Sequence, residues 1–315
     1  MARVVVFDEF GGPEVLRIVE EPVAEPAVGE VRVRIEAFAV NPLDRMMRSG
    51  AMPGAVTLPH ARLGVEGTGV IDAVGAEVAG FADGDPVVIA ALPDAGVRGS
   101  YAEYTTLPAS RVIARPAGLS VPEAAAIWVA YSTAYGALVE KGGMRPGDHI
   151  LVTAASGAVG RAALRIAARM GAVPIAVTRD SAKTGELLAA GAAAVIATDR
   201  ESIADGVRRH APGGADLVLD LVTGPGQREL LAAARPGAPL IAAGFLDPRP
   251  ADSPVEHYRS FEHTLDPVVV ERMARFLDAD RDRPDIDEVF AFDDVVRAHR
   301  HLERGRYSGK IVVSV

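Results

Sequence analysis

Along residues 1–115 the apolar positions recur in short runs, and Gly and Pro residues separate these runs. The segment VRVRIEAFAV, at 31–40, begins with alternating apolar and charged residues, which is the period of a half-buried strand. Further short strands are expected at 3–7, 16–19, 67–75 and 85–90. Short strands at this spacing predict a barrel-like or sandwich-like β unit.

From about residue 120 the pattern changes to strands that alternate with helices. The strand candidates are short, apolar and not alternating, and they lie at 149–152, 173–177, 193–196, 216–222 and 239–244. Such strands are typical of a parallel sheet that helices cover on both faces. The helix after the first of them is expected to be amphipathic, because arginine and apolar residues fall on opposite faces. The arginines are Arg161, Arg165 and Arg169, and the apolar residues are Val159, Ala163, Ile166 and Met170.

The end of the chain, GKIVVSV at 309–315, returns to a strand after a helix expected near 293–304. We expect this strand to join the N-terminal unit. The predicted fold class is therefore α/β, with two domains. A β-barrel domain spans 1–118 and is completed by 283–315, and a doubly wound parallel-sheet domain spans 119–282.

Composition and charge restrict the classes of function. The 315 residues are 49% hydrophobic, which is enough to bury a large core. A formal charge of −9 and a pI near 5.3 disfavour nucleic acid or an anionic membrane as the main partner. The absence of cysteine excludes disulfides, a thiol nucleophile and any zinc site that needs thiolate ligands.

Neither a signal peptide nor a membrane span is expected. The N-terminal apolar run is short and meets Asp8 and Glu9. The most apolar stretch elsewhere, 124–131, is far shorter than the roughly 20 residues that a membrane helix requires. A cytoplasmic, soluble protein is the expectation.

A small-residue turn follows the strand at 149–152. Its register, Ala155-x-Gly157-x-x-Gly160, is a variant of G-x-G-x-x-G, and a second apolar strand ends about 20 residues later. In dinucleotide-binding units the backbone N–H groups of such a turn face a pyrophosphate. Here they would belong to Ser156, Gly157, Ala158, Val159 and Gly160. A turn that serves only close packing is the alternative.

The end of the second strand of this unit selects the cofactor. NAD-binding units usually place Asp or Glu there to bind the ribose 2′-hydroxyl. The stretch here is VTRDSAK, in which Thr178, Arg179 and Lys183 fit a 2′-phosphate instead. Only 3 of the 33 basic residues are lysines, so the position of Lys183 is informative. Asp180 is a contrary signal, because its carboxylate would repel a phosphate, unless it caps the next helix. From Arg179 and Lys183 we predict NADPH.

Taken together, these motifs resemble the medium-chain dehydrogenase/reductase superfamily, in its zinc-free quinone oxidoreductase-like (zeta-crystallin-like) branch. The segments that carry the resemblance are VNPLD (40–44), LGVEGTGVIDAVGAEVAGFADGDPVV (63–88), YSTAYGALVE (131–140), GDHILVTAASGAVG (147–160) and GKIVV (309–313). The resemblance implies a GroES-like β domain that carries both chain ends, and a Rossmann domain between them. It also implies NADPH-dependent reduction of a quinone or of an activated C=C bond.

The same resemblance implies that no metal is bound. Zinc alcohol dehydrogenases of this superfamily hold the catalytic metal with a Cys, a His and a second Cys. Aligned by motif, these ligands fall at Asn41, Val65 and near Val129, and neither valine can coordinate a metal. Glu66, which helps to position zinc in metal relatives, is expected to be structural. His299 and His301 are expected at the surface rather than in a metal site.

Residues for the chemistry also follow from the resemblance. Asn41 would donate a hydrogen bond to a substrate carbonyl, with a loop that caps its own backbone as the alternative. Tyr131 and Thr133 would flank the nicotinamide, unless they form a helix cap. Gly244, Phe245 and Leu246 would hold the nicotinamide carboxamide. The tyrosine proton donor of some relatives is replaced near Met52, which leaves Tyr131, His60 or water.

Two expectations concern assembly and the competing class of function. The segment 247–267 is shorter than in related sequences, where this region often joins two subunits, and a homodimer is expected. The alternative function is a catalytically weak NADPH-binding protein, either a sensor or a structural protein of the same fold.

Overall fold

The computed structural model describes the chain except for residues 53, 91, 93, 245, 248, 254–265 and 279. The chain forms two compact units. One consists of Met1–Val129 and Thr264–Val315, and the other of Ala130–His263. The predicted α/β class is confirmed, since one unit is built on mainly antiparallel strands and the other on a parallel sheet. The predicted domain limits, at 118/119 and 282/283, stay a prediction.

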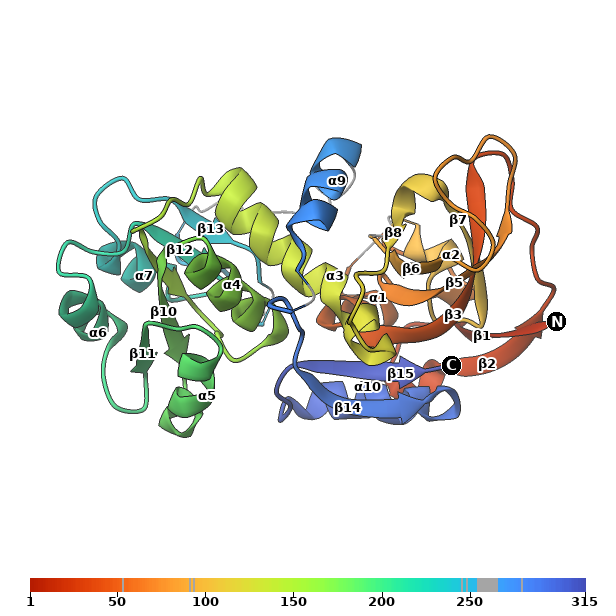
Figure 1. The fold of residues 1–315 in the computed structure, drawn as a ribbon. Helices are drawn as coiled ribbons and strands as arrows, with labels where there is room; N and C mark the ends of the chain where they lie inside the picture. Colours follow the sequence, from red (N-terminus) through yellow and green to blue (C-terminus); the bar gives the residue numbers. More distant parts are fainter. Residues whose placement is uncertain are drawn as a thin grey trace. The chain divides into compact units, whose positions relative to one another are not determined.

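The first unit carries both chain ends and two sheets (Figure 1). The larger sheet has the order β14-β15-β3-β5-β6-β8, with β7 paired to β3, and the smaller has the order β2-β1-β4. The strands are β1 (Ala2–Phe7), β2 (Arg17–Glu21), β3 (Glu30–Val40), β4 (Ala61–Arg62), β5 (Gly67–Val74), β6 (Pro86–Ile89), β7 (Tyr104–Pro108), β8 (Val112–Ala114), β14 (Ile286–Ala291) and β15 (Lys310–Ser314).

The alternation of apolar and charged residues along the central strand β3 determines which of its side chains enter the core of this unit. Val31, Val33 and Ile35 are buried, while the arginines between them point away from the core. Phe38, from the same strand, stacks on Tyr101 with 4.1 Å between the ring centroids. The helices are α1 (Pro42–Ser49), α2 (Ala95–Arg98), α9 (Pro267–Phe276) and α10 (Val295–Arg304), with 3-10 turns at Pro13–Val15, Ala109–Arg111 and Phe292–Asp294.

The last strand, β15, completes the larger sheet, as the sequence predicts. It pairs antiparallel with β3 and parallel with β14, so the C-terminal residues belong to the N-terminal unit. Helix α3 (Val121–Tyr135) spans the boundary between the units and continues as a π-helical segment, Gly136–Lys141.

The second unit is built on a parallel sheet with the order β11-β10-β9-β12-β13. Numbered from β9, this is the order 3-2-1-4-5 of Rossmann domains, in which ligands bind beyond the carboxyl ends of the strands. The strands are β9 (His149–Val152), β10 (Val173–Thr178), β11 (Ala194–Ala197), β12 (Leu217–Asp220) and β13 (Leu240–Ala242). The helices are α4 (Ala158–Arg169), α5 (Thr184–Ala189), α6 (Ile203–His210) and α7 (Gln227–Ala233), with a 3-10 turn at Ser181–Lys183.

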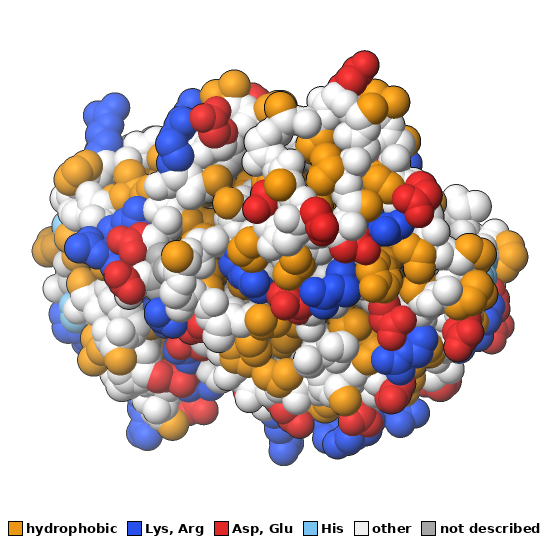
Figure 2. All heavy atoms as spheres, turned by 45° about the vertical axis from the view of Figure 1, so that its right-hand side comes forward, with side chains coloured by type: hydrophobic (Ala, Val, Ile, Leu, Met, Phe, Trp, Pro, Cys, Tyr) orange, Lys and Arg blue, Asp and Glu red, His pale blue; other side chains and the backbone are white. Residues whose placement is uncertain are grey.

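The surface mixes charges of both signs. On the face drawn in Figure 2, Lys and Arg side chains lie among Asp and Glu side chains, and neither sign forms a continuous field. A nucleic-acid surface is typically a continuous basic stripe or patch, and this face shows none.

In the described part of the chain, no helix has both the length and the apolar character needed to cross a membrane.

Candidate cofactor turn and buried charge cluster

The glycine-rich turn joins β9 to α4. Gly160 packs against the turn so closely that a Cβ atom there would lie 2.6 Å from Ala155 Cα and 2.7 Å from Ala154 O. Gly157 is open by contrast, since a Cβ atom would meet only Ala154 O, at 3.4 Å. The two glycines therefore serve different ends. Gly160 allows the helix to approach the strand, and Gly157 leaves space in front of the helix.

The backbone of this turn offers some of the predicted donors but not all of them. The N–H of Gly157 donates to Ala154 O at 3.0 Å and is therefore already used. Ala158, Val159 and Gly160 open the first turn of α4, where N–H groups have no intrahelical acceptor. The N–H groups of this first helical turn could therefore bind a phosphate.

Two basic residues converge on Ser156 in the turn. Lys183 Nζ lies 3.3 Å from Ser156 Oγ, so the structure brings these two predicted site residues together. Arg161 Nε donates to Ser156 O at 3.1 Å, and its guanidinium pairs with Glu186 at 2.8 Å. Arg161 is only 6% exposed, so the first arginine of the charged face predicted for α4 is buried. The ion pair with Glu186 of α5 is what permits this burial.

The segment after β10 contains Arg179, which favours a 2′-phosphate, and Asp180, which disfavours it, and the structure gives these two side chains different roles. Thr178 is buried at the end of the strand. Asp180 Oδ1 accepts from the N–H of Ala182 at 2.9 Å, so its carboxylate caps the following 3-10 turn. Arg179 is exposed, and it makes no hydrogen bond or ion pair with any residue that the structure describes. The free guanidinium is therefore available to an anion.

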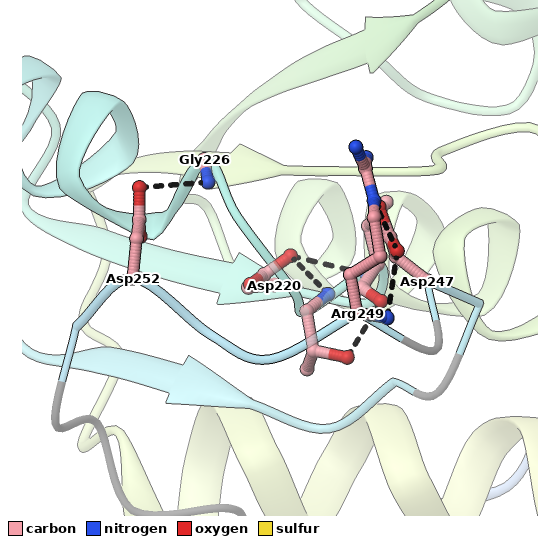
Figure 3. A network of polar contacts seen from close by, with 7 residues as sticks. Asp220, Gly226, Asp247, Arg249 and Asp252 are labelled. Atoms are coloured by element: carbon pink, nitrogen blue, oxygen red, sulfur yellow. Dashed lines mark hydrogen bonds and ion pairs between the residues drawn. The ribbon is translucent and has the colours of Figure 1, made fainter.

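A polar network holds the loops after β12 and β13 (Figure 3). Asp220 Oδ1 accepts from Thr153 Oγ1 at 2.9 Å and from the backbone N–H groups of Val222 and Thr223 at 3.0 and 3.2 Å. Thr223 Oγ1 in turn donates to Gly244 O at 3.1 Å, which links the two loops. Asp252 Oδ2 accepts from the N–H of Gly226 at 3.0 Å, and Arg249 pairs with Asp247.

Three of the predicted cofactor residues follow β13. Gly244 lies so close to the residue after β12 that a Cβ atom would fall 1.7 Å from Leu221 O, so only glycine fits there. Leu246 is 55% exposed. Phe245 lies outside the described residues.

In the first unit, Asn41 precedes helix α1 and is 3% exposed. Its backbone N–H donates to Asp44 Oδ2 at 2.8 Å. Its carboxamide Nδ2 donates to Glu66 Oε1 at 3.0 Å and to Ala39 O at 3.3 Å, and its Oδ1 accepts from Lys310 Nζ at 2.6 Å. An ammonium only donates and a carboxylate only accepts, so these two neighbours determine which end of the amide is oxygen.

Glu66 is the centre of this cluster and is fully buried. Its Oε1 pairs with the ammonium of Lys310, and its Oε2 accepts from the N–H of Val129 at 2.8 Å. The three positions that align with zinc ligands thus lie around the Glu66 carboxylate. The Asn41 side chain and the Val129 N–H donate hydrogen bonds to it, and Val65 precedes it in sequence. None of these three side chains offers the thiolate or imidazole ligands of such a zinc site.

The sequence interpretation missed Lys310, although a signal was present. The chain contains only three lysines, and this one opens the apolar strand β15. A rare cation placed in an apolar strand indicates a buried partner.

A second buried chain of polar groups extends from Asp44. Burial raises the pKa of Asp44 from 3.8 to about 6, although hydrogen bonds from the N–H groups of Asn41 and Gly64 oppose the shift. Burial also raises the pKa of Tyr101 well above its usual value, and the neighbouring Asp44 carboxylate adds to the shift. Tyr101 OH lies 3.2 Å from His299 Nε2. Burial, helped by the charge of Arg48, lowers the pKa of His299 to about 3, so this histidine is neutral.

The family of the chain follows from comparison with known proteins. Residues 27–117 match the alcohol dehydrogenase GroES-like domain, and residues 190–313 match the zinc-binding dehydrogenase family. A 2-methylene-furan-3-one reductase from Solanum lycopersicum is 32% identical over 316 residues, which cover 98% of this chain and 77% of the relative. The chain belongs to the medium-chain dehydrogenase/reductase superfamily. It is an oxidoreductase of that superfamily, in the quinone oxidoreductase-like branch that the sequence motifs indicate.

Two solved structures of medium-chain dehydrogenase/reductases resemble it over nearly their whole length. An NAD-dependent alcohol dehydrogenase has a TM-score of 0.88 and 33% identity, with 99% of each chain covered. The Escherichia coli quinone oxidoreductase complexed with NADPH has a TM-score of 0.89 and 25% identity, with 100% of each chain covered.

The remaining site residues that the superfamily resemblance implied lie on α3 and at the surface. Tyr131 and Thr133 are both buried, at 1% and 7% exposure, in the part of α3 that belongs to the second unit. They lie inside the helix rather than at its N-terminus, so the capping alternative is wrong. His60, considered as a proton donor, is at the surface, where its Nε2 lies 2.8 Å from Glu21 Oε1.

The histidines near the C-terminus also differ from expectation in one respect. His299 is fully buried against Tyr101, so its predicted surface position is wrong, because α10 turns this residue toward the core. His301 is partly exposed and pairs with Asp287 at 2.7 Å. With Glu288 these two form the one group of metal-compatible side chains found among the described residues.

Proposed function

We propose that this medium-chain dehydrogenase/reductase is an NADPH-dependent reductase that transfers a hydride to a quinone or to a C=C bond conjugated with a carbonyl. The observation that carries the proposal is the pair formed by a free Arg179 and by Lys183 on Ser156, at the end of β10. The names of two relatives, a 2-methylene-furan-3-one reductase and a quinone oxidoreductase complexed with NADPH, support the reaction and the cofactor.

The residues present fit a phosphorylated dinucleotide. The space in front of Gly157 and the first turn of α4 would hold the pyrophosphate. Arg179 would form two hydrogen bonds to the 2′-phosphate, and Lys183 would add a second positive charge there. Asp180 does not oppose this, because its carboxylate is used as a cap. When bound, NADPH supplies the hydride.

Hydride addition to the β carbon of an enone places negative charge on the carbonyl oxygen, and a quinone behaves in the same way. One or two neutral donors can stabilise that charge without a metal. In Asn41, one N–H is held by the Glu66 carboxylate at 3.0 Å, whereas the other makes the longer 3.3 Å bond to Ala39 O. We propose that this second N–H gives up its hydrogen bond to Ala39 O and donates to the substrate oxygen instead. Water or Tyr131 then supplies the proton that completes the reduction.

Turnover with a matched panel tests the proposal. The protein is mixed with NADPH and several quinones and conjugated enones, and the absorbance of the reduced nicotinamide is followed. A second arm combines NADP⁺ with simple secondary alcohols. We expect turnover in the first arm and none in the second. Alcohol oxidation at rates that match enone reduction would refute the reaction. Tight NADPH binding with no turnover of any acceptor would instead support the alternative of a sensor or structural protein.

We also propose that the protein is a homodimer. The segment 247–267 is the expected contact, and residues 254–265 within it lie outside the described part of the chain. Sedimentation equilibrium should give about twice the 32.9 kDa mass of one chain, and a mass of one chain would contradict the proposal.

A further inference from the structure

Strand register brings a buried cation to the proposed catalytic amide. β15 pairs antiparallel with β3, with Ile311 opposite Val40. Continued by one residue, this register places Lys310 opposite Asn41. The two residues are 269 positions apart in sequence, yet Lys310 Nζ lies 2.6 Å from Asn41 Oδ1. The contact therefore follows from the pairing of the two strands.

The environment of Lys310 is unusual for a lysine. Its side chain is 5% exposed, and that of its partner Glu66 is fully buried. In many proteins, removing two charges from water costs more free energy than their attraction in a buried ion pair returns. Apolar residues of similar size in place of such a pair often give equal or greater stability. Stability alone thus gives no reason for an ammonium at this position. A requirement for orientation does give one, because the ammonium contacts Asn41 and Glu66 at the same time.

We propose that Lys310 is a positioning residue for Asn41. Its ammonium holds the carboxamide oxygen, so the amide N–H groups face Glu66 and the side on which Ala39 O lies. The same contact draws electron density toward the oxygen and strengthens the N–H groups as donors. The inference rests on the proposed function, in which one of these N–H groups stabilises the charged substrate oxygen.

Removal of the ammonium alone is a poor test, because it leaves Glu66 as an unpaired buried charge that can unfold the protein. The informative variant is therefore the double substitution Lys310→Met with Glu66→Gln, which removes both charges. In this variant the amide at position 66 can either accept from Asn41 or donate to it, so nothing fixes the orientation of the Asn41 carboxamide. Lys141→Met is the matched control, because Lys141 is an exposed lysine at the end of the π-helical segment.

Kinetics give the first readout. We expect the double variant to lose about 10- to 100-fold in kcat, somewhat less than complete loss of one oxyanion donor. The KM for NADPH should remain within about 2-fold of the parent value, since both substitutions lie in the first unit and Arg179 and Lys183 lie in the second. The control should keep the parent kcat. A folded double variant with the parent kcat would overturn the proposal.

Nuclear magnetic resonance gives a second readout that needs no turnover. Asn41 is the chain's only asparagine, so protein labelled with ¹⁵N in asparagine side chains shows a single NH₂ pair. We expect this pair to exchange slowly with solvent in the parent and in the control. In the double variant it should shift and exchange faster. An unchanged NH₂ pair would show that Lys310 does not orient the amide.

The two readouts separate the failure of this inference from that of the proposed function. If the parent protein reduces no acceptor, the proposed function fails, and the NH₂ pair alone decides whether Lys310 orients Asn41.

Discussion

Arg179→Ala is the change that tests the cofactor assignment most sharply. The side chain is exposed and makes no hydrogen bond or ion pair with another described residue, so its removal breaks no polar contact among them. A charge-assisted hydrogen bond contributes about 1.5–3 kcal/mol, and because this contact is exposed to solvent we expect the two bonds of Arg179 together to contribute about that amount. At about 1.4 kcal/mol per factor of ten, the loss in NADPH affinity should be about 10- to 100-fold.

The assay is equilibrium binding of NADPH and of NADH, followed by nicotinamide fluorescence. The affinity for NADH should remain within about 2-fold, because NADH has no 2′-phosphate for Arg179 to bind. Arg208→Ala serves as control, since Arg208 is an exposed arginine of α6 that pairs only locally with Asp205, and its removal changes the net charge equally. Lys183→Ala should cost less than Arg179→Ala, because Lys183 also contacts Ser156.

Salt adds an independent check on the electrostatic origin of the effect. The difference between the parent and Arg179→Ala should shrink as ionic strength rises, because the contact lies at the surface. Equal affinities of the parent for NADPH and NADH, or an equal loss for both in the variant, would show that Arg179 does not read the 2′-phosphate.

Three further predictions concern the glycine turn, the buried carboxylate and the metal. Gly160→Ala should lower the free energy of unfolding by about 1–3 kcal/mol, because the new Cβ meets backbone at 2.6 Å, whereas Gly157→Ala should leave stability nearly unchanged and weaken NADPH binding. Thermal unfolding and binding assays separate the two, and equal effects of both substitutions would contradict the different roles. The pKa of Asp44 is about 6 in the folded protein, against its ordinary value of 3.8, so between these pH values the folded state holds a proton that the unfolded state lacks. This stabilisation is fully present below pH 3.8 and is lost as the pH rises through 6. The free energy of unfolding of the parent, measured with denaturant, should therefore fall by about 2 kcal/mol between pH 4 and 7 relative to Asp44→Asn, and parallel pH profiles would refute the shift. Elemental analysis of dialysed protein should find no stoichiometric zinc, and about one zinc per chain would show the alignment of Asn41 with a metal ligand to be wrong.

Local patterns predicted the parts of the molecule that neighbours in sequence determine. The five strands of the parallel sheet are mostly apolar runs without alternation, and the turn at Gly157 is built from consecutive small residues. Helix α1 was missed, although Asn41, Pro42 and Asp44 form a start signal of N-cap, N1 proline and N3 acid. The two-residue strand β4 shows no period at all.

The buried groups that matter most for chemistry were the hardest to predict. Lys310 reaches Asn41 only because two strands far apart in sequence pair in one register. Arg161 is buried because Glu186, on another helix, neutralises it. His299 lies on an amphipathic helix whose orientation depends on packing against Tyr101. Such contacts are tertiary, so sequence periodicity does not identify the partners, although it does place His299 on the same face of α10 as Val295, Ala298 and Leu302.

The central claim is direct hydride transfer to a carbon conjugated with a carbonyl. NADPH that carries deuterium at both C4 positions of the nicotinamide ring is incubated with the protein and a conjugated enone in ordinary water. Mass spectrometry and proton spectra then locate the label in the product. The account predicts one deuterium on the β carbon and a solvent hydrogen on the α carbon. Deuterium on the carbonyl carbon, or a reduced product without deuterium, would contradict it.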